Sequence, residues 1–159
     1  MQDLLPIATR IGERLKARGE TICAVESSIG GLLSAALLSV PGASAYYIGG
    51  AVIYTRTAGD ALLMIPPEAR VGLRASTEPY AMLMARTIRQ RLNTTWGISE
   101  TGASGPTGNR YGDAAGHACV AISGPTERSI TIETGQPDRV ANMRAFAAAA
   151  FALFEDVLR

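Results

Sequence analysis

The sequence predicts a single-domain α/β/α fold, in which helices cover both faces of a mixed β-sheet. Helix-like and strand-like patterns alternate along the 159 residues, and the first strand-like run, residues 22–25 (ICAV), is apolar throughout. A strand with that pattern is covered on both faces, so a layer of helices is expected on each side of the sheet. No linker or internal repeat interrupts the pattern, and we expect residues 1–159 to form one domain of ordinary size.

The first half of the chain alternates clearly. We expect a helix, a strand, a helix, a strand and a short helix at residues 2–18, 22–25, 32–40, 46–54 and 57–64. Gly19, Pro41 and Pro66 are the stop signals that follow the three helices. The strand at 46–54 contains Gly49 and Gly50, which indicates a bulge or a close approach of another backbone.

The second half continues the alternation with a long helix, three strands and a last helix. Ser76, Thr77 and Pro79 are typical of a helix start. Strands are expected at residues 96–100, 117–123 and 129–134, with the last two joined as an antiparallel hairpin. The final helix is expected to begin near Asp138.

Composition narrows the classes of partner and compartment. A formal net charge of +1 gives no electrostatic argument for nucleic acid or an anionic membrane as a partner. Cys23 and Cys119 lie in apolar runs without a metal-ligand companion, which is typical of buried thiols in a reducing compartment. No signal peptide or membrane-spanning run is evident, so we expect a cytoplasmic protein.

The turn that follows the first strand, residues 26–31, is the strongest candidate for chemistry. Ser27 and Ser28 stand between a buried strand and a helix, where free N–H groups and the helix dipole favour negative charge. One interpretation is that a serine caps the helix. The other is a nucleophile held on a tight turn beside oxyanion donors, although the G-x-S-x-G form is absent.

A second glycine-rich stretch occupies residues 101–108 (TGASGPTG). It follows a strand without opening a helix, and its spacing is that of neither a dinucleotide fingerprint nor a Walker loop. Taken alone, this stretch predicts a loop.

Three motifs together resemble a known family. They stand at residues 24–31 (AVESSIGG), 41–54 (PGASAYYIGGAVIY) and 101–106 (TGASGP). They are similar to the patterns A-E-S-C-T-G-G, P-G-S-S-x-x-F-x-G-G-x-x-x-Y and T-G-I-A-G-P of the CinA C-terminal domain family, which includes the nicotinamide-nucleotide amidohydrolases. The resemblance covers nearly the whole chain in order.

The resemblance implies a homo-oligomeric α/β protein that hydrolyses the carboxamide of nicotinamide mononucleotide to the acid and ammonia, without a metal or other cofactor. It implies that Ser27 is the nucleophile and that Tyr54 and Thr101 belong to the catalytic site, so the two turns should meet at a nucleotide-sized cavity. The substrate-binding positions that it implies are Glu26, Ser28, Gly30, Gly31, Gly50, Gly102, Gly105 and, from the last helix, Arg144.

The chain also departs from the family pattern. Members with amidase activity carry a lysine five residues after the tyrosine, where it acts as the base beside the serine, and here that position is Gly59. Ile29 replaces a threonine, and residues 113–116 (DAAG) replace K-P-V-G. A serine without an adjacent base is a poor nucleophile, so these changes affect the expected chemistry directly.

Two hypotheses of function therefore stand side by side. In the first, the chain is a Ser27-dependent amidohydrolase with a base other than lysine. In the second, it binds a nucleotide-like small molecule without hydrolysing it, as a sensor or an assembly partner. His117, the only histidine, is either a general base or a strand-end histidine bonded to a carbonyl.

Overall fold

The computed structural model describes all residues, 1–159, as five α-helices, three short 3₁₀ helices and five strands. The α-helices are α1 (Leu5–Arg18), α2 (Leu32–Leu38), α3 (Arg56–Leu63), α4 (Glu78–Leu92) and α5 (Arg139–Val157). The strands are β1 (Ile22–Glu26), β2 (Tyr47–Val52), β3 (Trp96–Ala103), β4 (His117–Ser123) and β5 (Arg128–Glu133). The 3₁₀ helices are Gln2–Leu4, Ala43–Ala45 and Pro67–Arg70.

The five strands form one mixed sheet in the order β2-β1-β3-β4-β5. β1 pairs in parallel with both β2 and β3, whereas β3, β4 and β5 pair antiparallel in sequence. Because β1 lies between parallel neighbours, its carboxyl end and that of β3 meet at one edge, where ligands of open α/β sheets usually bind.

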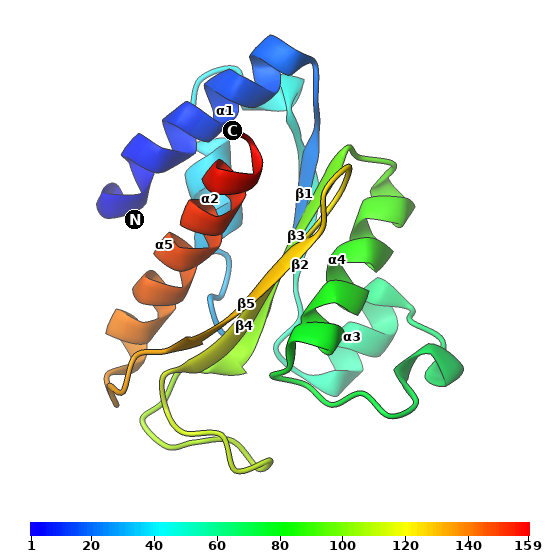
Figure 1. Cartoon of the computed structure of the whole chain (residues 1–159), viewed down its shortest axis with the longest axis vertical. Helices are drawn as coiled ribbons and strands as arrows, with labels where there is room; N and C mark the ends of the chain where they lie inside the picture. The colour runs from blue at the N-terminus through cyan, green and yellow to red at the C-terminus, as the bar shows by residue number, and fades with distance from the viewer.

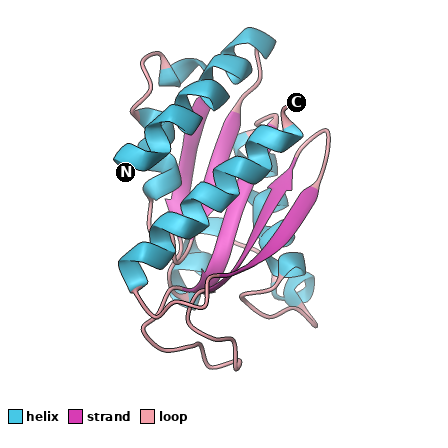
Figure 2. Cartoon of the chain, turned by 60° about the vertical axis from the view of Figure 1, so that its left-hand side comes forward, coloured by secondary structure: helices cyan, strands magenta, loops and turns pink.

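Helices cover both faces of the sheet (Figures 1 and 2), which confirms the predicted fold class. α1, α2 and α5 lie on one face and α3 and α4 on the other (Figure 1). Every residue of β1 is buried, as the unbroken apolar run predicts.

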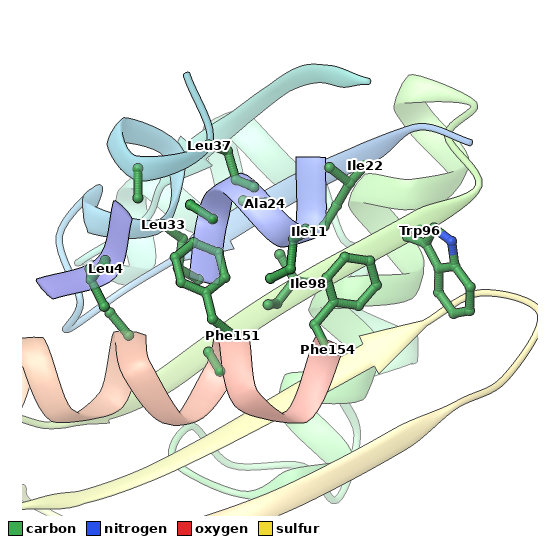
Figure 3. Packing of buried hydrophobic residues seen from close by; sticks show 14 of the residues in the cluster. Leu4, Ile11, Ile22, Ala24, Leu33, Leu37, Trp96, Ile98, Phe151 and Phe154 are labelled. Carbon is green, nitrogen blue, oxygen red and sulfur yellow. The ribbon is translucent and has the colours of Figure 1, made fainter. Parts of the chain in front are cut away.

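The larger core lies under α1, α2 and α5 and holds 26 buried residues. Phe151 and Phe154 of α5 pack against aliphatic side chains of α1, α2 and the sheet (Figure 3). The rings of Trp96 and Phe154 meet edge-on at 5.5 Å and 70°, a favourable aromatic geometry. Two smaller clusters, which contain Cys23 and Cys119, lie under α3 and α4.

The order of elements matches the predicted order, and the differences are at the ends of elements. α1 stops at Gly19 in the left-handed conformation, and Asp138 caps α5 by accepting from Ala141 N at 2.9 Å, as predicted. The prediction for the third strand was too short: β3 continues through Ala103, because Thr101, Gly102 and Ala103 pair with β4. Part of the expected glycine-rich loop is therefore strand.

None of the helices combines the length and the apolar character needed to cross a lipid bilayer.

Candidate functional site

Glu26, the last residue of β1, shapes the turn between β1 and α2. Its fully buried carboxylate accepts hydrogen bonds from the N–H groups of Gly31 (2.8 Å), Leu33 (3.0 Å) and Ser34 (2.8 Å). These are the orphan donors of a helix N-terminus, and a carboxylate there is also favoured by the helix dipole. The interpretation of Ser27 or Ser28 as the helix cap is therefore wrong: Gly31 is the N-cap residue and Glu26 supplies the acceptor.

A second buried carboxylate, that of Glu100 on β3, holds the other half of the turn. It accepts from Ser27 N at 3.1 Å and Ile29 N at 3.0 Å, and the Ser28 hydroxyl donates to it. Burial, together with the nearby charge of Glu26, raises the pKa of Glu100 to about 7, although the hydrogen bonds from these three donors lower it.

Glu100 was not predicted as a site residue from the sequence. The available signal was a carboxylate in an otherwise apolar strand, directly before Thr101, because a buried acid needs partners. Its partners come from β1, and the sequence alone does not give the register between the two strands.

A cavity of about 590 Å³ lies at this edge of the sheet and is lined by residues of α3, α4 and the segment between them. Ser27, Tyr54 and Thr101 all line it, as does Gly102. The cavity is large enough for a small-molecule ligand. The expectation that the turn at residue 27 and the segment at residue 101 meet at one cavity is confirmed.

Thr101 directly follows Glu100 on β3, so the two side chains point to opposite faces of the sheet, and that of Thr101 lines the same cavity as Ser27. The Thr101 hydroxyl oxygen accepts from Ser76 N at 3.1 Å, so its own proton remains available to a ligand.

Tyr54 follows the end of β2 and is well exposed, at 61%. Its phenol oxygen accepts from Arg139 Nη2 at 2.7 Å, and Arg139 also donates to the Gly105 carbonyl. Arg139 therefore ties Tyr54 to the glycine-rich segment and leaves the phenol proton free.

No lysine or histidine lines the cavity. Gly59 does line it, and a Cβ added there would meet only Ile53 Cδ1, at 3.8 Å. Lys16, the only lysine of the chain, donates to the Pro41 carbonyl instead. There is therefore room for a side chain at position 59, where the family has its lysine, but glycine supplies no group that could accept a proton.

His117 is the start of β4 and is buried. Nδ1 contacts the Glu133 carboxylate, and Nε2 lies 2.9 Å from the Ser76 carbonyl oxygen. Burial lowers its pKa, but Glu133 and the Ser76 carbonyl raise it by more, so the net pKa is raised. This is the environment of a strand-end histidine bonded to a carbonyl, and His117 does not line the cavity.

Of the expected substrate-binding positions, only Gly102 lines the cavity. The others lie elsewhere or have internal partners: Glu26, Ser28, Gly30, Gly31, Gly50, Gly105 and the exposed Arg144.

Two of these glycines are explained by packing within the chain. A Cβ at Gly50 would stand 2.5 Å from the Ala24 carbonyl oxygen, and one at Gly105 would stand 2.6 Å from the Pro137 carbonyl oxygen. Gly105 also has a φ of +106°. Both positions therefore need glycine for the chain's own backbone, without a ligand.

No group of three or more His, Cys, Asp and Glu side chains is arranged to hold a metal ion. The polar side chains that line the cavity carry hydroxyl groups, the Asn109 amide and the guanidinium groups of four arginines: Arg56, Arg70, Arg74 and Arg110.

Comparison with known proteins places the chain in a family. Residues 4–158 match the sequence model described as CinA C-terminal domain. A CinA-like protein of Salinibacter ruber is 36% identical over 140 residues, which are 88% of this chain and 34% of that protein. A CinA-like protein of Myxococcus xanthus is 37% identical over 139 residues, 86% of this chain and 32% of that protein. The chain thus spans about a third of the length of the curated relatives it matches.

Solved structures have the same fold. A competence-damaged protein (CinA) superfamily protein from Enterobacter cloacae has a TM-score of 0.90 and 25% identity, with 98% of this chain and 92% of that chain covered. The competence/damage inducible protein CihA from Agrobacterium tumefaciens has a TM-score of 0.90 and 24% identity, with 99% and 96% covered.

Proposed function

Since the chain belongs to the CinA C-terminal domain family, we propose that it hydrolyses the carboxamide of nicotinamide mononucleotide, or of a closely related pyridine nucleotide, with Ser27 as the nucleophile. The observation that carries the proposal is the meeting of Ser27, Tyr54 and Thr101 at one cavity. The family resemblance further supports a cytoplasmic homo-oligomer that works without a metal or cofactor.

The proposed reaction has two stages. Ser27 Oγ attacks the amide carbon, the C–N bond breaks, and ammonia leaves with the proton that the serine loses. Water then attacks the acyl-serine, releases the carboxylic acid and restores the hydroxyl. The Thr101 hydroxyl, whose oxygen already accepts from Ser76, is free to donate to the oxyanion.

The serine proton needs an acceptor, and the family lysine is absent. We assign this step to Tyr54, which lines the cavity and keeps its own proton free while it accepts from Arg139. In this scheme Tyr54 takes the Ser27 proton as it gives its own proton to the leaving nitrogen. His117 is a poorer candidate because both of its ring nitrogens have partners outside the cavity.

A second candidate function is ligand binding without hydrolysis. It is favoured by Gly59, which stands where the base is expected, and by a cavity that contains no lysine or histidine. The same cavity would then serve a sensor or an assembly partner.

The two candidate functions are distinguished by incubating the pure protein with nicotinamide mononucleotide and measuring ammonia over time. The first function predicts release by the wild type, none by Ser27→Ala, and a loss of about 100-fold or more for Tyr54→Phe. Ser44→Ala is the matched control, because Ser44 is exposed and lies outside the cavity.

The other outcomes are equally decisive. Ammonia release by Tyr54→Phe but not by His117→Ala would show that His117, and not Tyr54, accepts the serine proton. Saturable calorimetric binding without ammonia above the Ser27→Ala blank would favour the second function. No ammonia and no binding would reject both for this ligand.

A further inference from the structure

The arginines of the cavity form a group that neither the family motifs nor the proposed nucleophile explains. Arg56 lies on α3, Arg70 and Arg74 lie between α3 and α4, and Arg110 lies on the loop between β3 and β4. We call these four residues the arginine wall. No aspartate or glutamate is among the 20 residues that line the cavity.

The arginine wall pairs with two aspartates that do not themselves line the cavity. Asp113 contacts Arg74 through two hydrogen bonds, of 2.6 and 2.9 Å. Asp60 contacts Arg70 and lies 3.7 Å from Arg56. Four guanidinium groups against two carboxylates leave an excess of two positive charges at the cavity.

Two arginines of the wall keep unused donors. Arg56 contacts only Asp60, at 3.7 Å, and its side chain is 78% exposed. Arg110 donates only to the Tyr111 hydroxyl, at 3.1 Å, and lies 5.2 Å from the centre of that ring. A guanidinium has five N–H donors in a planar fork that matches phosphate oxygens.

The glycine-rich segment, residues 101–108, is a poorer site for an anion than the arginine wall. A Cβ at Gly105 would meet the Pro137 carbonyl oxygen, and one at Gly108 would stand 2.2 Å from the Asp113 carbonyl oxygen. These close approaches are to the chain's own carbonyl groups, which repel anions. The loop is packed against itself at these two positions.

We propose that the arginine wall binds the phosphate group of a phosphorylated sugar or nucleotide, while the other end of the ligand reaches Ser27. The inference rests on the proposed function for the reacting end of the ligand. The phosphate site itself depends only on the arginines. The unused donors of Arg56 and Arg110 and the excess positive charge at a cavity of about 590 Å³ carry it.

The test uses calorimetric titration of the pure chain with ribose 5-phosphate, and with ribose as the uncharged counterpart. Arg56→Ala and Arg110→Ala are the variants of choice, because these side chains make few internal contacts. Arg86→Ala is the matched control: Arg86 is an exposed arginine that pairs with Glu127 and lies outside the cavity.

We expect ribose 5-phosphate to bind and ribose not to bind. Each wall variant should raise the Kd by about tenfold, the effect of losing a charge-assisted hydrogen bond, while Arg86→Ala leaves it unchanged. Binding should also weaken as salt is added.

An unchanged Kd in Arg56→Ala and Arg110→Ala, equal effects of Arg86→Ala, or no saturable binding of ribose 5-phosphate would each overturn the proposal. A parallel titration of nicotinamide mononucleotide into Ser27→Ala distinguishes the two claims. Binding of ribose 5-phosphate but not of the nucleotide would retain the arginine wall and reject the proposed substrate.

Discussion

The Glu100 carboxylate on β3 accepts a hydrogen bond from the backbone N–H of Ser27, 3.1 Å away, at the end of β1. The candidate nucleophile is thus positioned by an acid that is fully buried on the opposite face of the sheet. Glu26 holds the helical half of the same turn, so two buried carboxylates fix the segment that carries Ser27.

The first prediction concerns pH and Glu100. Because burial raises the folded-state pKa of this carboxyl to about 7, above its usual value of about 4.3 when unfolded, the folded protein binds the proton more tightly. Its contribution to stability is complete below about pH 4 and is lost as the pH rises toward 7. We expect the free energy of unfolding of the wild type to fall relative to Glu100→Gln by about 3 kcal/mol over this range.

Urea unfolding of both proteins at pH 5 and pH 8 measures the difference. Glutamine keeps the shape and cannot ionise, and the titration of His117 is common to both chains and cancels. Parallel stability curves for the two proteins would show that Glu100 does not titrate in this way.

The second prediction concerns the cap of α2. Glu26→Ala leaves the N–H groups of Gly31, Leu33 and Ser34 without their buried acceptor. We expect a loss of about 2–4 kcal/mol in the free energy of unfolding, measured by chemical denaturation. Glu26→Gln, which keeps one acceptor oxygen, should lose less. Equal losses in the two variants would mean that the side chain acts by filling space rather than by accepting hydrogen bonds.

The order of helices and strands could be predicted because its signals are local. Gly19 and Pro66 mark helix ends within a few residues, and the apolar run of β1 shows burial on both faces. The helix cap could not be predicted in this way. Serines next to a helix start are good caps in general, but Glu26 reaches the same N–H groups from the strand before them.

The site was predictable only in part, for a related reason. The family motifs bring Ser27, Tyr54 and Thr101 together correctly, because each motif fixes one short stretch of backbone. The contacts of Glu100 with Ser27 and of Arg74 with Asp113 join residues 73 and 39 positions apart. Such pairs depend on strand register and loop packing, which no single stretch of sequence specifies.

The third prediction compares two glycines. Gly50→Ala places a Cβ 2.5 Å from the Ala24 carbonyl oxygen, so β1 and β2 must separate locally. We expect this variant to lose about 1–3 kcal/mol of stability. Gly59→Ala lies inside α3 with open space around it and should gain up to about 1 kcal/mol. Thermal unfolding of the two variants measures whether Gly50→Ala is destabilised and Gly59→Ala is stabilised. A destabilised Gly59→Ala would show that α3 has no room for a side chain at this position.

The fourth prediction restores the missing base. The Cβ of Gly59→Lys would meet only Ile53 Cδ1, and the position lines the same cavity as Ser27, so a lysine there can extend toward the nucleophile without repacking the core. If the loss of this base limits hydrolysis, Gly59→Lys should release ammonia from nicotinamide mononucleotide at least about 100-fold faster than the wild type. Gly59→Arg is the matched control, since it adds a cation of similar reach that cannot act as a base near neutral pH. A rate gain shared by both variants would indicate that the added charge tightens substrate binding. A gain in Gly59→Lys alone, abolished by adding Ser27→Ala, would show that the cavity still holds a working nucleophile that lacks only its proton acceptor.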